Sequence, residues 1–196
     1  MWQTVLSTVR DDDPDDHDDG SDAALVEAAR TDAAAFERLY LGYRDRIYWY
    51  LRGRTADDED AADLTQQVFL RVLDALPQYQ PRRGPFAAWL FGIARHMAAD
   101  AHRRRRTTVA WEGVPAALQP VDGTDLEAAA LRRDALDRLD ALVRALDPEK
   151  REVLTLRFAA RLTIAEIAAV IGKREDATRK YLARTLQTLK ERYDDQ

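Results

Sequence analysis

Arginine and aromatic side chains alternate in one part of the chain, from residue 78 to residue 106. Seven arginines and a single aspartate fall within residues 82–107. Guanidinium groups bind phosphates and aromatic ring faces stack on unpaired bases, so this composition favours contact with single-stranded or locally opened nucleic acid. Core packing is the competing interpretation for the rings of Phe86, Trp89 and Phe91, and for at least one of them we expect it.

A second concentration of basic residues lies in residues 148–193, which hold eleven bases and six acids. Thr163 and Glu166 have the spacing of a capping box, and Gly172 stands where a helix-ending glycine is expected. A short capped helix, a tight turn and a long basic helix are typical of a helix-turn-helix, whose second helix enters the major groove. An ordinary helical hairpin is the alternative. The residues expected to face DNA are Lys173, Arg174, Glu175, Thr178, Arg179, Lys180, Tyr181 and Arg184.

Helical periodicity extends over nearly the whole chain, and no alternating strand pattern is convincing. Helix starts are expected at Ser21 or Asp22, at Thr31 or Asp32, at Asp57 and at Asp147, because short polar side chains cap the free N–H groups of a first turn. The helix after Asp57 is expected to end near Leu76. Its predicted buried side consists of Leu64, Val68, Phe69, Val72, Leu73 and Leu76.

These elements predict an all-α protein with two small helical domains joined by a flexible linker. The expected boundaries are a disordered acidic tail over residues 1–20, a first domain over 21–106, the linker over 107–124 and a second domain over 125–196. The formal net charge is −5. The isolated chain should therefore bind DNA weakly, and the slack linker should leave its two basic domains uncoordinated.

Several classes of site are excluded or disfavoured by composition. The chain has no cysteine, which excludes disulfides and thiolate metal sites. The acidic run around Asp57 is adequately explained as a helix start, and His96 stands beside a positive charge and lacks a coordinating neighbour. We therefore expect no metal or other cofactor. No segment is apolar enough for membrane insertion and none has the features of a signal peptide, so a cytoplasmic protein is expected.

Three segments in this order resemble the extracytoplasmic-function class of bacterial RNA polymerase sigma factors, the group IV sigma factors. Residues 63–71 resemble the segment that binds core polymerase, and residues 84–95, with Asp100, Arg103 and Arg104 after them, resemble the promoter-melting segment. Residues 146–158 and 164–172 resemble region four of these proteins. The resemblance covers about residues 22–193 and implies a transcription initiation factor, not an enzyme.

The resemblance also implies partners and residue roles. Expected partners are core RNA polymerase (through the β′ clamp helices and the β flap), promoter DNA and an anti-sigma factor, because many members are held inactive by one. The last helix would read the minus-thirty-five element. Core binding would use Asp63, Gln66, Gln67 and Arg71, and minus-ten recognition would use Gln78, Tyr79, Arg82, Arg83, Phe86, Trp89, Arg95, His96, Arg103 and Arg104.

Four positions depart from the family pattern. His96 stands where Asn is usual, and Ala177 and Tyr181 replace the Thr and Arg common in the reading helix. Arg174 replaces a frequent Ser, which removes the expected capping side chain. The alternative function is a stand-alone helix-turn-helix regulator that binds an operator without polymerase, and it gives no reason for residues 63–71 or 84–106.

Overall fold

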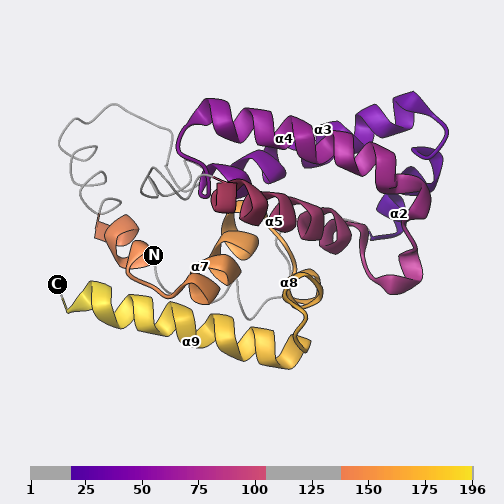
Figure 1. Ribbon diagram of the computed structural model, residues 1–196. Coiled ribbons are helices and arrows are strands. Elements are labelled where there is room, and N and C mark those ends of the chain that lie inside the picture. The colour runs from indigo at the N-terminus through magenta and orange to yellow at the C-terminus, as the bar shows by residue number, and fades with distance from the viewer. Residues whose placement is uncertain (1–18, 105–137, 196) are drawn as a thin grey trace, which may run out of the picture.

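A computed structural model of the chain describes residues 19–104 and 138–195, with side chains from Asp22 onward, and the described regular structure is entirely helical (Figure 1). The predicted all-α class is therefore confirmed. The tail over residues 1–18, the predicted linker over 107–124 and the beginning of the second predicted domain lie outside the described residues. The helices are α2 (Asp19–Ala28), α3 (Ala33–Arg52), α4 (Asp58–Ala75), η1 (Leu76–Gln78), η2 (Pro81–Arg83), α5 (Phe86–Arg104), α7 (Pro148–Leu154), η4 (Thr155–Ala159), α8 (Ile164–Ile171) and α9 (Glu175–Asp194), and residues 138–144 are also helical.

Aspartate caps begin three of these helices, as expected from the sequence. The side chain of Asp32 accepts a hydrogen bond from the backbone N–H of Ala34 at 2.9 Å, and Asp147 accepts one from Lys150 at 3.0 Å. The first helix differs, because it begins at Asp19, ahead of both predicted caps. Asp22 instead accepts a hydrogen bond from the hydroxyl of Tyr43, and burial, together with this carboxylate, raises the pKa of that phenol.

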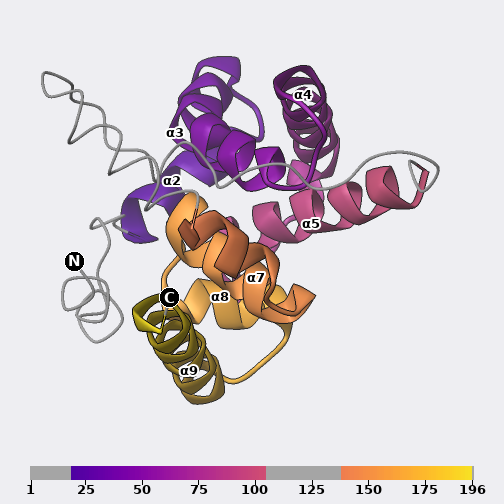
Figure 2. The ribbon, with the colours of Figure 1, turned by 90° about the vertical axis from the view of Figure 1, so that its left-hand side faces the viewer.

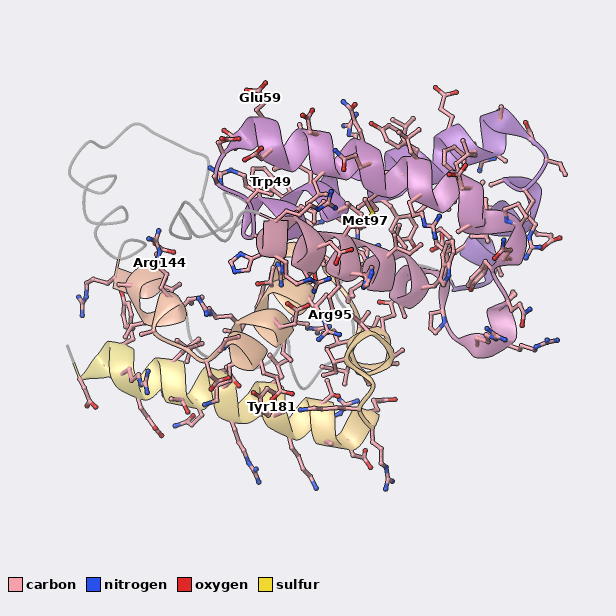
Figure 3. The ribbon with its side chains drawn as sticks, viewed as in Figure 1. Trp49, Glu59, Arg95, Met97, Arg144 and Tyr181 are labelled. Carbon is pink, nitrogen blue, oxygen red and sulfur yellow. The ribbon has the colours of Figure 1, made fainter. Side chains whose placement is uncertain are left out.

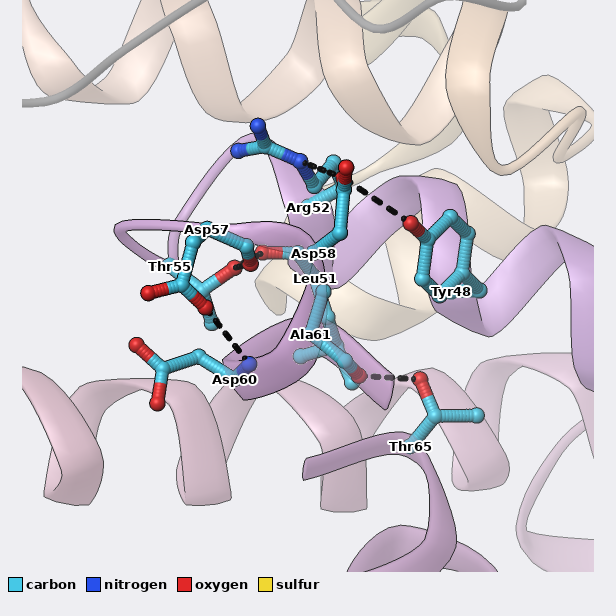
Figure 4. A network of polar contacts seen from close by, with 9 residues as sticks. All are labelled: Tyr48, Leu51, Arg52, Thr55, Asp57, Asp58, Asp60, Ala61 and Thr65. Atoms are coloured by element: carbon cyan, nitrogen blue, oxygen red, sulfur yellow. Dashed lines mark hydrogen bonds and ion pairs between the residues drawn. The ribbon is translucent and has the colours of Figure 1, made fainter. Parts of the chain in front are cut away.

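The acidic run between α3 and α4 is a polar turn that starts α4 (Figure 4). Asp57 accepts a hydrogen bond from the backbone N–H of Asp60 at 2.8 Å. Asp58 accepts hydrogen bonds from Arg52 and Tyr48, and these donors lower the pKa of its carboxyl group. The carboxylates are thus used as caps and ion pairs. Among the described residues, no group of histidine and carboxylate side chains could hold a metal ion.

The N-terminal helices α2–α5 pack around an apolar core whose members include Leu39, Ile47, Val68, Leu90 and Phe91. The prediction for one side of α4 is largely confirmed, because Leu64, Val68, Phe69, Val72 and Leu76 are buried. The prediction that Leu73 is buried was wrong, since 48% of its surface is exposed. Leu73 follows Val72 by a single helical position, about 100° around the helix axis, which turns it away from the core.

The C-terminal helices form the predicted helix-turn-helix geometry. Thr163 and Glu166 make both hydrogen bonds of a capping box at the start of α8. Gly172 ends α8 in the left-handed region with φ 69°, which costs glycine little because it has no Cβ. One feature was not predicted, the π-helical turn η4 after α7. It buries Arg157, whose guanidinium donates to the carbonyl of Leu162 at 3.0 Å.

The two groups of helices pack against one another, and both ribbon views place α5 between the N-terminal helices and the C-terminal ones (Figures 1 and 2). α5 contacts α8, and α3 contacts η4. Arg46 of α3 donates to the carbonyl oxygens of Ala160 and Arg161, at 2.8 and 3.1 Å. The expectation of uncoordinated domains therefore does not describe this structure, because apolar helix faces and buried polar groups join them.

Candidate nucleic-acid and partner interfaces

Four polar residues predicted to bind a partner lie on one side of α4. Asp63, Gln66, Gln67 and Arg71 are all exposed, whereas Leu64 and the rest of the core-facing stripe point to the opposite side. The spacing of three and four residues explains this arrangement, because such positions share one face of an α-helix. One side of α4 therefore packs in the core, and the opposite side is polar and exposed.

Two leucines interrupt this polar side, and they were not identified as site residues from the sequence. Leu70 is 64% exposed and Leu73 is 48% exposed, and both share the face of Gln66 and Gln67 by helical spacing. We call this exposed side of α4, formed by the four polar residues and the two leucines, the α4 outer face. Exposed apolar side chains that adjoin one another and are rimmed by polar residues are a feature of protein-binding sites. The helical period could have revealed it, because Leu70 follows Gln66 by four residues and Gln67 by three. The α4 outer face consists of Asp63, Gln66, Gln67, Leu70, Arg71 and Leu73.

The aromatic residues before α5 are mostly interior. Tyr79 is 7% exposed and Phe86 is 4% exposed, and their rings meet edge to face with centroids 5.5 Å apart. Trp89 is partly exposed and packs against both rings, at 5.1 and 5.6 Å. The prediction that Tyr79 and Phe86 face a nucleic acid does not match their positions here. Phe86 begins α5 on its core side, where Tyr43 also meets its ring.

Arg30 holds the segment around Tyr79 in place, a role that no local sequence signal indicated. Its guanidinium donates to the carbonyl of Tyr79 at 2.7 Å and to that of Pro77 at 3.3 Å. The phenol of Tyr79 in turn donates to the carbonyl of Gly84 at 3.0 Å. This closed loop leaves its polar side chains outside, because Gln78, Arg82 and Arg83 are all exposed.

The outer side of α5 carries the remaining candidate minus-ten residues. The imidazole of His96 is exposed and lies 3.4 Å from the carboxylate of Asp100, which also pairs with Arg103, so His96 does have a carboxylate neighbour, contrary to the expectation from the sequence. Arg104 is exposed near the end of the helix. Arg95 differs from these, because it points between α5 and the C-terminal helices (Figure 3), where its Nε lies 3.6 Å from Glu152.

On α9 the structure corrects one predicted contact. Thr178 is fully buried, and its hydroxyl donates to the carbonyl of Arg174 at 3.1 Å. It belongs to the packed stripe because it precedes Leu182 by four residues. Arg174 begins the helix without a side-chain cap, as expected. The other predicted residues are exposed (Lys173, Arg174, Glu175, Lys180 and Arg184) or partly exposed (Arg179 and Tyr181).

Glu149 of α7 connects to the start of the reading helix. It pairs with the ammonium group of Lys173 and accepts a hydrogen bond from the hydroxyl of Tyr181 at 3.4 Å. The Lys173 Nζ lies 4.9 Å from the centroid of the Tyr181 ring, which faces α7 (Figure 3). Burial, with Asp147 and Glu149 beside it, raises the pKa of Tyr181 to about 12. Two candidate DNA contacts are thus held by one carboxylate.

No described helix combines the length and the apolar character needed to cross a membrane.

Comparison with known proteins connects these surfaces to a family. Residues 39–108 match the family model for sigma-70 region 2, and residues 136–189 match that for sigma-70, region 4. The extracytoplasmic-function (ECF) RNA polymerase sigma factor BldN of Streptomyces coelicolor is 36% identical over 89% of this chain and 66% of its own length. ECF sigma factor SigD of Mycobacterium tuberculosis is 35% identical over 87% of this chain and 82% of its own length.

The fold gives the same result. The structure of CnrH in complex with the cytosolic domain of CnrY superposes with a TM-score of 0.63 at 25% identity, and the match covers 88% of this chain and 96% of CnrH. Two matched regions, relatives over most of the chain and a shared helical fold agree. The chain belongs to the extracytoplasmic-function sigma factors of bacterial RNA polymerase.

Proposed function

We propose that this sigma factor docks on the β′ clamp helices of core RNA polymerase through the α4 outer face, directs the enzyme to specific promoters and helps to open the minus-ten element. The observation that supports docking most strongly is the exposed pair Leu70 and Leu73 among polar residues, on the side of α4 opposite the core. Burial of these leucines supplies affinity, while the surrounding amide and charged groups give orientation.

The loop before α5 is the proposed site of minus-ten recognition. Gln78, Arg82 and Arg83 are exposed on a loop whose backbone is held by Arg30, so a captured base would meet a preformed surface. Unstacking a base costs a few kcal/mol, and pocket contacts offset that cost. Tyr79 and Phe86 act indirectly in this proposal, because they support Trp89 from the core.

The exposed side of α9 is the proposed reader of the minus-thirty-five element. Arginine pairs bidentately with guanine edges, and lysine neutralises phosphates. Arg179 is held by Glu175 with an N–O distance of 3.1 Å, and Lys173 by Glu149, so both cations are oriented before DNA arrives. We further propose that the C-terminal domain contacts the β flap, which would fix its distance from the N-terminal domain.

A regulatory protein is a further proposed partner. CnrH was solved in complex with the cytosolic domain of CnrY, and CnrH resembles this chain over most of its length. An anti-sigma factor that covers the α4 outer face or α9 would keep the chain from polymerase or promoter.

The competing function is a stand-alone helix-turn-helix regulator. It would use α9 equally well, but the α4 outer face would have no use in it. Run-off transcription separates the two functions. Purified core polymerase and this chain should give a transcript from a cognate promoter and none without the chain, while a stand-alone regulator would bind its operator and give no polymerase-dependent start.

A further inference from the structure

Glu152 of α7 reaches from the C-terminal domain into the N-terminal one. Its Oε1 accepts a hydrogen bond from the hydroxyl of Tyr50 at 2.9 Å and lies 3.6 Å from the Nε of Arg95. Its Oε2 pairs with the guanidinium of Arg54. The side chains of Glu152 and Arg54 are only 16% and 19% exposed. This carboxylate is therefore shielded, and it accepts hydrogen bonds from Tyr50 and Arg54 and forms an ion pair with Arg95, all in the other domain.

Arg46 makes a second connection of the same kind. It is buried, and it donates to two carbonyl oxygens at the end of η4, those of Ala160 and Arg161. Its guanidinium lies 4.9 Å from the ring centroid of Tyr43. Both connections place arginines of the N-terminal domain against oxygen acceptors of the C-terminal domain.

Arg54 and Arg95, which share Glu152, would suit another oxygen-rich ligand. A backbone phosphate of a nucleic acid offers anionic oxygens to several guanidinium groups at once, and arginine binds it through a planar fork of donors. The guanidinium of Arg54 is already fixed over the ring of Tyr50, with its Cζ 3.8 Å from the centroid. Arg95, in contact with the same carboxylate, belongs to the candidate minus-ten surface of α5.

We propose that Arg54 and Arg95, which share the carboxylate of Glu152, form a phosphate-binding site for the promoter strand, and that Glu152 occupies this site while the two domains are packed together. The inference rests on the proposed function, in which contact with both the β′ clamp helices and the β flap would separate the two domains. Separation removes the shared carboxylate from both guanidinium groups, and Arg54 keeps only its hydrogen bond to the carbonyl of Tyr50, at 2.7 Å. A phosphate replaces the lost acceptors, so domain opening and strand binding favour each other.

The first test measures binding of the full chain to a fluorescein-labelled single-stranded oligonucleotide of mixed sequence, by fluorescence anisotropy at low salt. Glu152→Gln should bind about fivefold more tightly than the original chain, because the internal competitor loses its charge. Glu191→Gln is the matched control, since Glu191 is exposed on α9 and its side chain accepts a hydrogen bond from Gln187. Adding Arg54→Gln to Glu152→Gln should abolish the gain. Equal affinities for the two glutamine variants, or a gain that survives Arg54→Gln, would overturn the proposal.

A second measurement uses the assembled holoenzyme and does not depend on the folding of Glu152→Gln. The dependence of promoter affinity on salt concentration should become shallower by about one phosphate contact in Arg54→Gln. Arg44→Gln is the control, because Arg44 is exposed on α3, away from Glu152, and pairs with Asp45. A slope unchanged from the control would refute the phosphate site. If the original holoenzyme meanwhile gives promoter-specific transcripts, the proposed function stands and only this inference fails.

Discussion

Replacing Leu70 by alanine removes the largest exposed apolar group of the α4 outer face and leaves the polar ones in place. Leu70 is 64% exposed in the free chain, so about two thirds of its side chain remains to be buried by a partner. Full burial of a leucine is worth about 1.5–3 kcal/mol, which makes the expected loss of binding free energy about 1–2 kcal/mol. The dissociation constant for core polymerase should therefore rise about five- to thirtyfold.

The assay is a titration of labelled sigma factor with purified core polymerase. Leu41→Ala is the matched control, because Leu41 is 54% exposed but lies on α3. Both variants should unfold at nearly the original temperature, since neither leucine belongs to the core. Equal affinity losses for the two variants, or no loss for Leu70→Ala, would refute the reasoning that places the docking site on α4.

Three further predictions concern the C-terminal domain. Arg179→Ala should weaken binding of a duplex containing the minus-thirty-five element by about tenfold, and core affinity in a pull-down should not change. Thr163→Ala should lower the free energy of unfolding by about 1 kcal/mol through loss of the capping box, and Thr163→Ser should restore most of it; equal stabilities in urea would contradict this. Tyr181 has a folded-state pKa of about 12 against about 10 unfolded, so the stability it contributes is complete below pH 10 and is lost toward pH 12. The urea midpoint should fall across that window more steeply than in Tyr181→Phe, and parallel curves would show that the phenol is not perturbed.

The helix boundaries were predictable where a single residue caps the beginning or the end of a helix. Asp32, Asp57, Asp147, Thr163 and Gly172 act locally, so the sequence around each of them is sufficient to place the end of its helix. Neither the early start of α2 nor the π-helical turn after α7 has such a local marker. The π-helical turn is accompanied by the burial of Arg157 and is followed by carbonyl groups that accept hydrogen bonds from Arg46, and both are properties of the packed chain.

The residues of the candidate surfaces were also predictable where helical spacing determines their position, and not where packing between domains determines it. Helical spacing was sufficient to bring the polar residues of α4 to one face, and it also contained the information on Leu73 and Thr178 that composition obscured. We expected Leu73 to be buried and Thr178 to face DNA, whereas the helical period places Leu73 at the surface and Thr178 in the core. Proximity across domains, such as that of Glu152 and Arg54, joins residues far apart in the chain and has no sequence signal.

The central claim is that the α4 outer face brings this chain to core polymerase and that α9 then selects the promoter. The most direct test is promoter-specific run-off transcription with purified core enzyme, using the original chain, Leu70→Ala and Arg179→Ala. The account predicts a sigma-dependent transcript whose yield returns at higher sigma concentration for Leu70→Ala, because only docking is weakened. For Arg179→Ala the yield should stay low at saturating sigma, because promoter selection is impaired. Absence of any sigma-dependent transcript from the original chain on every cognate promoter, together with no binding to core polymerase, would contradict it.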